Sequence, residues 1–209
     1  MNREKWMQTF GIGLTGGIAT GKSTVVRILR EIGVFVVDAD VLARKVVEPE
    51  SKAILQLAHE FGVDFLLPSG ELHRAKVREK ILVDSGLRKK LECILHPAIQ
   101  QQLWVELEKA NIIGKPVLWV YDAALLFEAH SQGRFREVWV TKCSREVQIA
   151  RVSSRDHISV DQATQLLQAQ WSTEEKCKRA SWVIDTEVPL AALQEKIHQK
   201  WKQINDGML

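Results

Sequence analysis

The chain has 209 residues, of which 45% are hydrophobic, enough for a sizeable core in one domain with an insertion or in two closely joined units. Its 29 Lys and Arg residues nearly balance 26 Asp and Glu residues, and the net charge of +3 argues against a nucleic-acid-binding protein, although it would suit a polyanionic small substrate if some cations converge. The sequence has no apolar run of membrane-spanning length, no signal peptide and no disulfide or metal spacing among its three cysteines, so we expect a reduced, cytoplasmic protein without a membrane partner or a structural metal.

The first predicted elements are a strand, a glycine-rich loop and a helix. Phe10, Ile12 and Leu14 form a short apolar strand, and an apolar stripe over residues 25–29 predicts the helix. The loop, GLTGGIATGKST at 13–24, fits the phosphate-binding pattern G-x-x-x-x-G-K-[ST] in the strand-to-helix context that the pattern requires. An ordinary turn with a solvated lysine is the alternative, but four glycines are costly to order without a function. We therefore predict a nucleoside triphosphate cradle of Gly16, Gly17, Ile18, Ala19, Thr20, Gly21, Lys22, Ser23 and Thr24.

The cradle suits phosphates for two physical reasons. Its glycines let successive backbone N–H groups converge on phosphate oxygens, and the helix that follows adds the positive end of its dipole. In this pattern Lys22 is expected to reach the β- and γ-phosphates, and the Ser23 hydroxyl is expected to bind Mg²⁺.

The second predicted strand, within GVFVVDAD at 33–40, ends in two carboxylates, Asp38 and Asp40. Ligands in open α/β sheets bind beyond the carboxyl ends of the strands, which is where both side chains are expected to lie. Asp commonly ends a strand and caps a helix, so capping is the alternative interpretation. Beside a triphosphate cradle we favour chemistry, because a kinase needs a carboxylate that orients the attacking hydroxyl and accepts its proton.

Residues 50–112 differ in character from the rest, because helical apolar stripes replace strands. Two of these stripes cover residues 91–95 and 99–107, and a turn is expected at 68–70. The segment therefore predicts a helical insertion into an α/β protein.

The sheet resumes within residues 116–128 and continues with strands in 136–143 and 180–185. Asp122 follows an apolar run, as does the acidic strand end that organises magnesium in P-loop enzymes, although a simple strand-terminating Asp is the alternative. Glu128 reads as a polar residue at a helix start. Together, the alternating elements predict a parallel sheet flanked by helices.

Residues 145–179 carry a pattern of arginines and glutamines. Arg145, Arg151 and Arg155 are expected on one helix, followed by a second helix rich in glutamine from 162 to 170. Such arginines usually form a solvated helix face. In phosphoryl transfer, however, a mobile segment can bring arginine over the phosphates, and for Arg155 we favour that role.

Motifs in order along residues 11–185 resemble those of the dephospho-coenzyme A kinase family. They are GLTGGIATGKST, DAD with VLARKVVEP after it, LHP at 95–97, LLFE at 125–128, SRD at 154–156, AQWSTEEK at 169–176 and VID at 183–185. The resemblance implies a P-loop kinase with a parallel sheet flanked by helices, a helical substrate-binding insertion and a helical lid. It also implies transfer of the γ-phosphate of ATP to the ribose 3′-hydroxyl of dephospho-coenzyme A, the last step of coenzyme A synthesis.

The resemblance also implies roles for single residues. Asp40 corresponds to the catalytic base, Asp38 would support it, Lys22 would be the phosphate lysine and Arg155 the lid arginine. Ser23 and Asp122 are the expected Mg²⁺ ligands. The positions expected near the acceptor are Asp40, Arg44, His96 and, more weakly, Arg78. His96 precedes Pro97 and could instead cap or brace a helix start.

The expected organisation has three parts. A nucleotide-binding core comprises residues 1–48, 114–144 and 180–209, a coenzyme A-binding insertion comprises 49–113, and a lid comprises 145–179. Within this scheme the sequence departs from the family at three positions: Ala19 replaces a glycine, Ala124 a proline and Thr186 an asparagine, and the last change weakens any adenine contact there.

Two other functions compete with this interpretation. A nucleoside monophosphate kinase would share the cradle but should lack the DAD and LHP motifs. A GTP-dependent switch would need an N-K-x-D signature, which the sequence does not contain.

Overall fold

The computed structural model describes residues 1–207, and these divide into two compact units. The sheet unit is made of Met1–Val37 and the chain from Ile113 onward, and the helical unit is Asp38–Ile112. The helical unit thus contains most of the predicted insertion 49–113 but begins earlier, at Asp38. Residues 208 and 209, at the end of the predicted core, lie outside the described residues.

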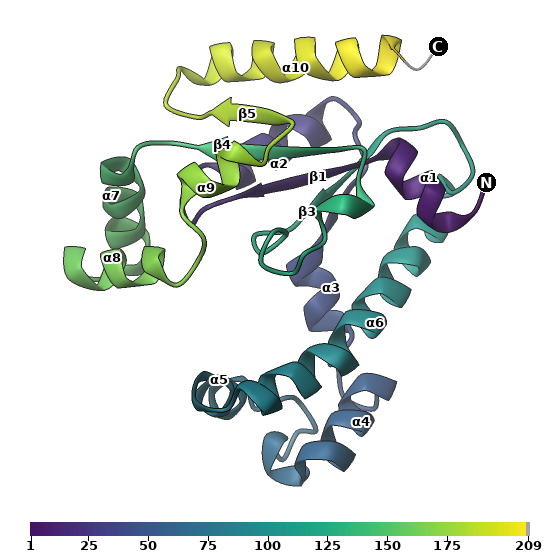
Figure 1. The fold of residues 1–209 in the computed structure, drawn as a ribbon, viewed down its shortest axis with the longest axis vertical. Coiled ribbons are helices and arrows are strands. Elements are labelled where there is room, and N and C mark those ends of the chain that lie inside the picture. Colours follow the sequence, from purple (N-terminus) through teal and green to yellow (C-terminus); the bar gives the residue numbers. More distant parts are fainter. Residues whose placement is uncertain (208–209) are drawn as a thin grey trace. The chain divides into compact units, whose positions relative to one another are not determined.

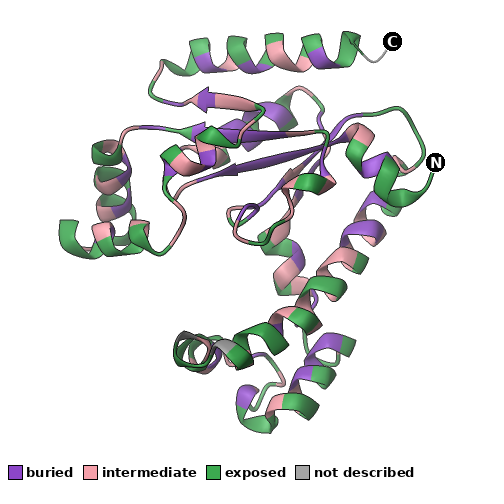
Figure 2. Ribbon diagram, in the orientation of Figure 1, coloured by how far each residue is buried: buried purple, intermediate pink, exposed green. Residues whose placement is uncertain are grey.

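The sheet confirms the predicted α/β class. Within the described residues its strands are β1 (Gly11–Gly16), β2 (Val36–Asp38), β3 (Trp119–Asp122), β4 (Glu137–Lys142) and β5 (Trp182–Asp185), in the order β2-β3-β1-β4-β5. The strand β1 pairs in parallel with β3 and β4 and is buried along its whole length (Figure 2). Its central place explains why all six of its residues, Thr15 included, are buried, because strands covered on both faces do not alternate between buried and exposed positions.

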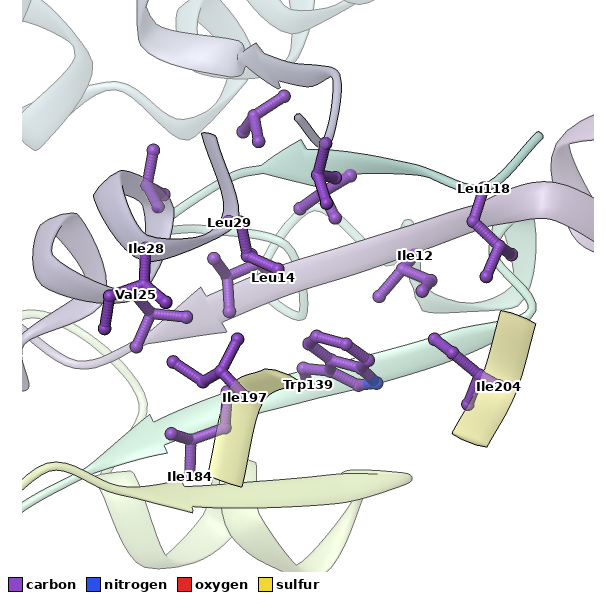
Figure 3. Packing of buried hydrophobic residues seen from close by; sticks show 14 of the residues in the cluster. Ile12, Leu14, Val25, Ile28, Leu29, Leu118, Trp139, Ile184, Ile197 and Ile204 are labelled. Atoms are coloured by element: carbon purple, nitrogen blue, oxygen red, sulfur yellow. The ribbon is translucent and has the colours of Figure 1, made fainter. Parts of the chain in front are cut away.

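Helices of the sheet unit are α1 (Arg3–Phe10), α2 (Lys22–Glu31), α7 (Arg145–Asp156), α8 (Val160–Gln168), α9 (Thr173–Lys178) and α10 (Leu190–Asp206). Arg145, Arg151 and Arg155 lie on one helix, as predicted. Figure 1 shows α7 and α8 beyond the carboxyl ends of β1 and β4. The main core lies where α2 and α10 pack on the sheet, around the fully buried Trp139 (Figure 3). Burying a side chain such as Ile12 or Leu29 stabilises the fold by about 1.5–3 kcal/mol.

The N-terminal helix α1 is not predicted from the sequence. Its apolar contribution to the core is limited to Trp6 and Met7, which leaves a weak helical stripe. Trp6 is 1% exposed, its ring stacks on Trp119 with centroids 5.9 Å apart, and its Nε1–H donates to the Lys115 carbonyl at 3.0 Å. One tryptophan therefore holds α1 against β3.

We expect Trp6→Ala to lower the free energy of unfolding by about 3–5 kcal/mol, because it leaves a cavity and an unpaired Lys115 carbonyl. Urea unfolding followed by far-UV circular dichroism measures the change. Lys5→Ala, at an exposed position of the same helix, is the control and should change the free energy by no more than about 0.5 kcal/mol. Equal effects of the two substitutions would show that Trp6 does not anchor α1.

The helical unit contains α3 (Ala39–Lys45), α4 (Lys52–Phe61), α5 (Arg74–Val83) and α6 (Ser85–Lys109). Its apolar core includes Ile54, Leu57, Phe65 and Leu91. An ion pair of 2.8 Å joins Lys45 on α3 to Glu106 on α6. This hydrogen bond raises the pKa of Lys45 and lowers the pKa of Glu106. The packing of α3 on α6 explains why this unit begins at Asp38.

Pro97 lies inside α6, so the possibility that His96 caps a helix start is wrong. The two predicted stripes at 91–95 and 99–107 belong to this single helix. Proline removes one backbone hydrogen bond and often ends a helix. Burial of Leu91 before it and of Leu103 and Leu107 after it offsets that loss.

Among residues 1–207, no helix is both long enough and apolar enough to span a membrane.

Candidate active site

The predicted cradle runs from the last residue of β1 through the turn at 17–21 into the first turn of α2, and its backbone explains its composition. A Cβ atom on Gly16 would lie 2.0 Å from the Thr141 Oγ1, so no side chain fits there. Gly21 has a φ of 86°, in the left-handed region that favours glycine. Ala19 also has a positive φ, 59°, which accounts for the glycine expected at its position.

The carbonyl oxygens of residues 17–20 face the protein and are held there. They accept, in order, from the Thr20 hydroxyl at 2.8 Å, the Gln148 amide at 2.7 Å, the Arg151 guanidinium at 3.1 Å and the Thr186 hydroxyl at 2.7 Å. Because these carbonyls are fixed, the first N–H groups of α2, which have no acceptor within the helix, are presented together at one end of the turn. Such an end favours an anion.

Lys22, the first residue of α2, donates from its Nζ to Oδ1 of Asp122. Asp122 is 6% exposed and ends β3 directly beside Leu14 of β1. A buried carboxylate requires a cationic or hydrogen-bonding partner, and Lys22 supplies one. The structure thus brings together two residues that were predicted separately, the phosphate lysine and the acidic strand end.

A cavity of about 420 Å³ adjoins the cradle and is lined in part by the predicted lid arginine, Arg155. Ser23 and Thr24 line it from α2, Arg151 and Arg155 line it from α7, and Thr186 lines it from the loop after β5. Arg155 is exposed and pairs with its neighbour Asp156 at 2.7 Å. That hydrogen bond raises the pKa of Arg155 and lowers the pKa of Asp156. The Thr186 hydroxyl donates to the Thr20 carbonyl of the cradle, so this side chain supports the loop at the position where the resemblance led us to expect asparagine.

The remaining predicted residues lie in the helical unit. Asp38 caps α3, with its Oδ1 accepting from the N–H groups of Asp40 at 2.8 Å and Val41 at 3.2 Å. Helix capping was the alternative interpretation for both carboxylates, and Asp38 has this role in the structure. Asp40 is exposed in the first turn of α3, and Arg44 donates to its carbonyl oxygen at 3.3 Å. Arg78 on α5 and His96 on α6 are both exposed.

Sequence reasoning gave no role to the ion pair between the buried Lys176 on α9 and the half-buried Glu128 after β3. Lys176 is 0% exposed, and its Nζ lies 2.9 Å from the Glu128 Oε1. Residues 124–129 form turns, so Glu128 is not at a helix start as expected. Glu128 belongs to the motif LLFE and Lys176 to the motif AQWSTEEK. Their opposite charges within two family motifs were the signal from which the pair could have been predicted.

Comparison with known proteins identifies one family. The family described as dephospho-CoA kinase matches residues 10–191. A dephospho-CoA kinase from Geobacter sulfurreducens is 45% identical over 190 residues, covering 91% of this chain and 96% of that protein. One from Shewanella oneidensis is 36% identical over 202 residues, covering 95% of this chain and 97% of that protein. The solved dephospho-CoA kinase from Campylobacter jejuni shares the fold, with a TM-score of 0.68 at 22% identity over 95% of this chain and 98% of that one.

Proposed function

The chain belongs to the dephospho-CoA kinase family, and we propose that the residues described above carry out the reaction of that family. This reaction is the ATP-dependent phosphorylation of dephospho-CoA in coenzyme A biosynthesis. The acceptor group is the ribose 3′-hydroxyl of dephospho-CoA. The enzyme acts in the cytoplasm. The observation that carries the proposal is the rigid cradle with Lys22 held beside its open end.

The cradle and Lys22 bind the triphosphate. The N–H groups at the start of α2 hold the phosphate oxygens, and the Lys22 ammonium exchanges Asp122 for the β- and γ-phosphates. Arg155 adds positive charge from the lid and helps to exclude water. Phosphoryl transfer needs little beyond positioning and charge stabilisation, and these residues supply both.

Ser23 and Asp122 would hold Mg²⁺. The described residues contain no cluster of three or more His, Cys, Asp or Glu side chains suited to a metal. This fits Mg²⁺, which in kinases binds through one or two protein ligands together with substrate phosphates and waters. When bound, Mg²⁺ would neutralise phosphate charge.

The residues proposed to act on the acceptor all belong to the helical unit. Asp40 accepts the proton of the attacking hydroxyl, and its exposed carboxylate is free of the capping duty that Asp38 performs. Arg44, Arg78 and His96 are exposed polar side chains of the same unit and contact the acceptor.

A coupled phosphotransfer assay over a panel of acceptors tests the function. With ATP as donor, dephospho-CoA should turn over faster than adenylate or thymidylate. Faster turnover of adenylate or thymidylate would overturn the assignment of the acceptor in favour of a nucleoside monophosphate kinase.

Arg155→Ala is expected to lower kcat at least about tenfold, since a hydrogen bond to a charged group contributes about 1.5–3 kcal/mol. Dephospho-CoA binding measured by calorimetry without ATP should change little, because the lid acts on closure. The control is Arg27→Ala, which removes an exposed guanidinium from the surface pair with Glu31 and should leave both quantities unchanged. An unchanged kcat in Arg155→Ala would contradict the lid role and favour the alternative interpretation, in which Arg155 belongs to a solvated helix face.

A further inference from the structure

A contact between the buried Lys176 and the half-buried Glu128 and Trp171 joins two segments of the sheet unit that are far apart in sequence. The Lys176 Nζ forms an ion pair with the Glu128 Oε1 at 2.9 Å and donates a hydrogen bond to the Ala124 carbonyl at 2.9 Å. The same Glu128 oxygen accepts from the Trp171 backbone N–H at 3.1 Å. We call these three residues the lid anchor, because Trp171 follows α8 and Lys176 lies on α9.

One side of the lid anchor holds the loop that begins at Asp122. The Ala124 carbonyl accepts from Lys176 and also from the Thr15 hydroxyl of β1 at 3.1 Å. Asp122, the partner of Lys22, lies two residues before Ala124. The lid anchor thus holds the chain two residues from the carboxylate beside the phosphate lysine.

The other side holds the base of the lid. The ring of Trp171 stacks on Phe127 with an interplanar angle of 3°, and the Arg179 guanidinium lies 4.8 Å from its centroid. Thr173, at the start of α9, donates to Gln148 at 3.3 Å, and Gln148 in turn donates to the cradle carbonyl of Ile18 at 2.7 Å. The end of the lid is thus connected to both the Asp122 loop and the cradle.

Stability alone does not explain this choice of residues. A buried ion pair is often replaced by apolar side chains of similar volume without loss of stability, since its desolvation cost offsets its attraction. The Oε2 of Glu128 is also buried without a hydrogen-bond partner among the described residues, which is unfavourable. The pair instead fixes the positions of two segments relative to each other. The Lys176 ammonium holds the Ala124 carbonyl of the loop after β3, and the Glu128 carboxylate, from the same loop, binds the Trp171 N–H at the base of the lid.

We propose that Lys176 and Glu128 are positioning residues, which hold the Asp122 loop and the base of the lid in register for phosphoryl transfer. The proposal rests on the proposed function in that the lid and Asp122 take part in the reaction. A misplacement of about 1 Å at a reacting group can cost about 10²-fold in rate. The expected signature is a loss in kcat without a matching loss in ATP binding.

The decisive variant is Lys176→Met/Glu128→Leu, which removes the ion pair but keeps an apolar volume. Its melting temperature should stay close to that of the wild type, its kcat should fall at least about tenfold, and its KM for ATP should change less than about threefold. Adding Arg155→Ala to the double variant should lower kcat by a smaller factor than it does in the wild-type enzyme, because an arginine that is already misplaced contributes less to the rate. The control is Lys200→Met/Glu137→Leu, which removes a half-buried pair at the opposite end of β4 and should leave kcat unchanged.

A folded double variant that retains more than about a tenth of the wild-type kcat overturns the proposal. If the double variant does not fold, Glu128→Gln decides, because it keeps the volume and an acceptor for the Trp171 N–H. A loss of at least about threefold in kcat at an unchanged melting temperature supports positioning, and a smaller loss overturns it. An Arg155→Ala enzyme with full activity would instead refute the lid arginine, and kcat of the pair variant alone would then decide the role of the lid anchor.

Discussion

Replacing Lys22 with Met is expected to lower kcat by about 10²-fold or more in a protein that remains folded. The ammonium should interact more strongly with the charge on the transferring phosphoryl group than with bound ATP, and only such differential interactions accelerate the reaction. Methionine preserves the length of the side chain and removes its charge. Steady-state kinetics with ATP and dephospho-CoA, together with thermal unfolding, measure the two effects separately.

Lys142→Met is the matched control for Lys22→Met. Lys142 ends β4 at the same edge of the sheet, and its exposed ammonium pairs with Asp185 at 3.6 Å. Exposed pairs of this kind contribute no more than about 1 kcal/mol, so the control should retain nearly normal kcat. Nearly normal turnover in a folded Lys22→Met protein would remove Lys22 from the mechanism.

Lys22→Met also alters the environment of Asp122, which is buried and loses its cationic partner. Part of the measured rate loss could therefore arise from a moved carboxylate. Lys22→Arg separates the two contributions, because guanidinium keeps the charge beside Asp122 but does not reproduce a compact ammonium at the phosphates. A large loss in Lys22→Arg with an unchanged melting temperature assigns the effect to the phosphates.

The sheet and the cradle could be predicted because their signals are local in sequence. Each of the strands β2 to β5 falls within a predicted segment, and β1 begins within the predicted strand but runs on to Gly16, into the predicted loop. The cradle needs glycine where a Cβ atom would collide, as at Gly16, so its motif is visible directly. The contact between Lys22 and Asp122 was not predicted, because it depends on β3 lying beside β1.

What could not be predicted depends on contacts between distant residues. Helix α1 is stabilised by the stacking of Trp6 on Trp119, which its own sequence does not reveal. Lys176 reads as one more charge on a polar helix until the fold places it beside Glu128. Pro97 suggests a helix start in isolation, whereas tertiary packing carries α6 through it.

Asp40→Asn is expected to lower kcat by about 10² to 10⁴ while folding and ATP affinity remain nearly intact. A ribose hydroxyl has a pKa far above neutrality, so its attack on phosphorus benefits from a base that aligns the oxygen and accepts the proton as bonding proceeds. Asparagine keeps the size and one polar oxygen but removes both the charge and the proton acceptor. The cap of α3 should survive, because the Asp38 side chain supplies it.

Asp38→Asn is the matched comparison for Asp40→Asn, two residues away and with the same chemical change. Asparagine is as good a helix cap as aspartate, so the N–H groups of Asp40 and Val41 should keep their acceptor and kcat should fall less. An Asp40→Asn enzyme that folds and keeps more than about a tenth of the wild-type kcat would lie outside the range for losing a general base. Asp38 would then be the next candidate, and a larger loss in Asp38→Asn would show that the cap of α3 is also the base.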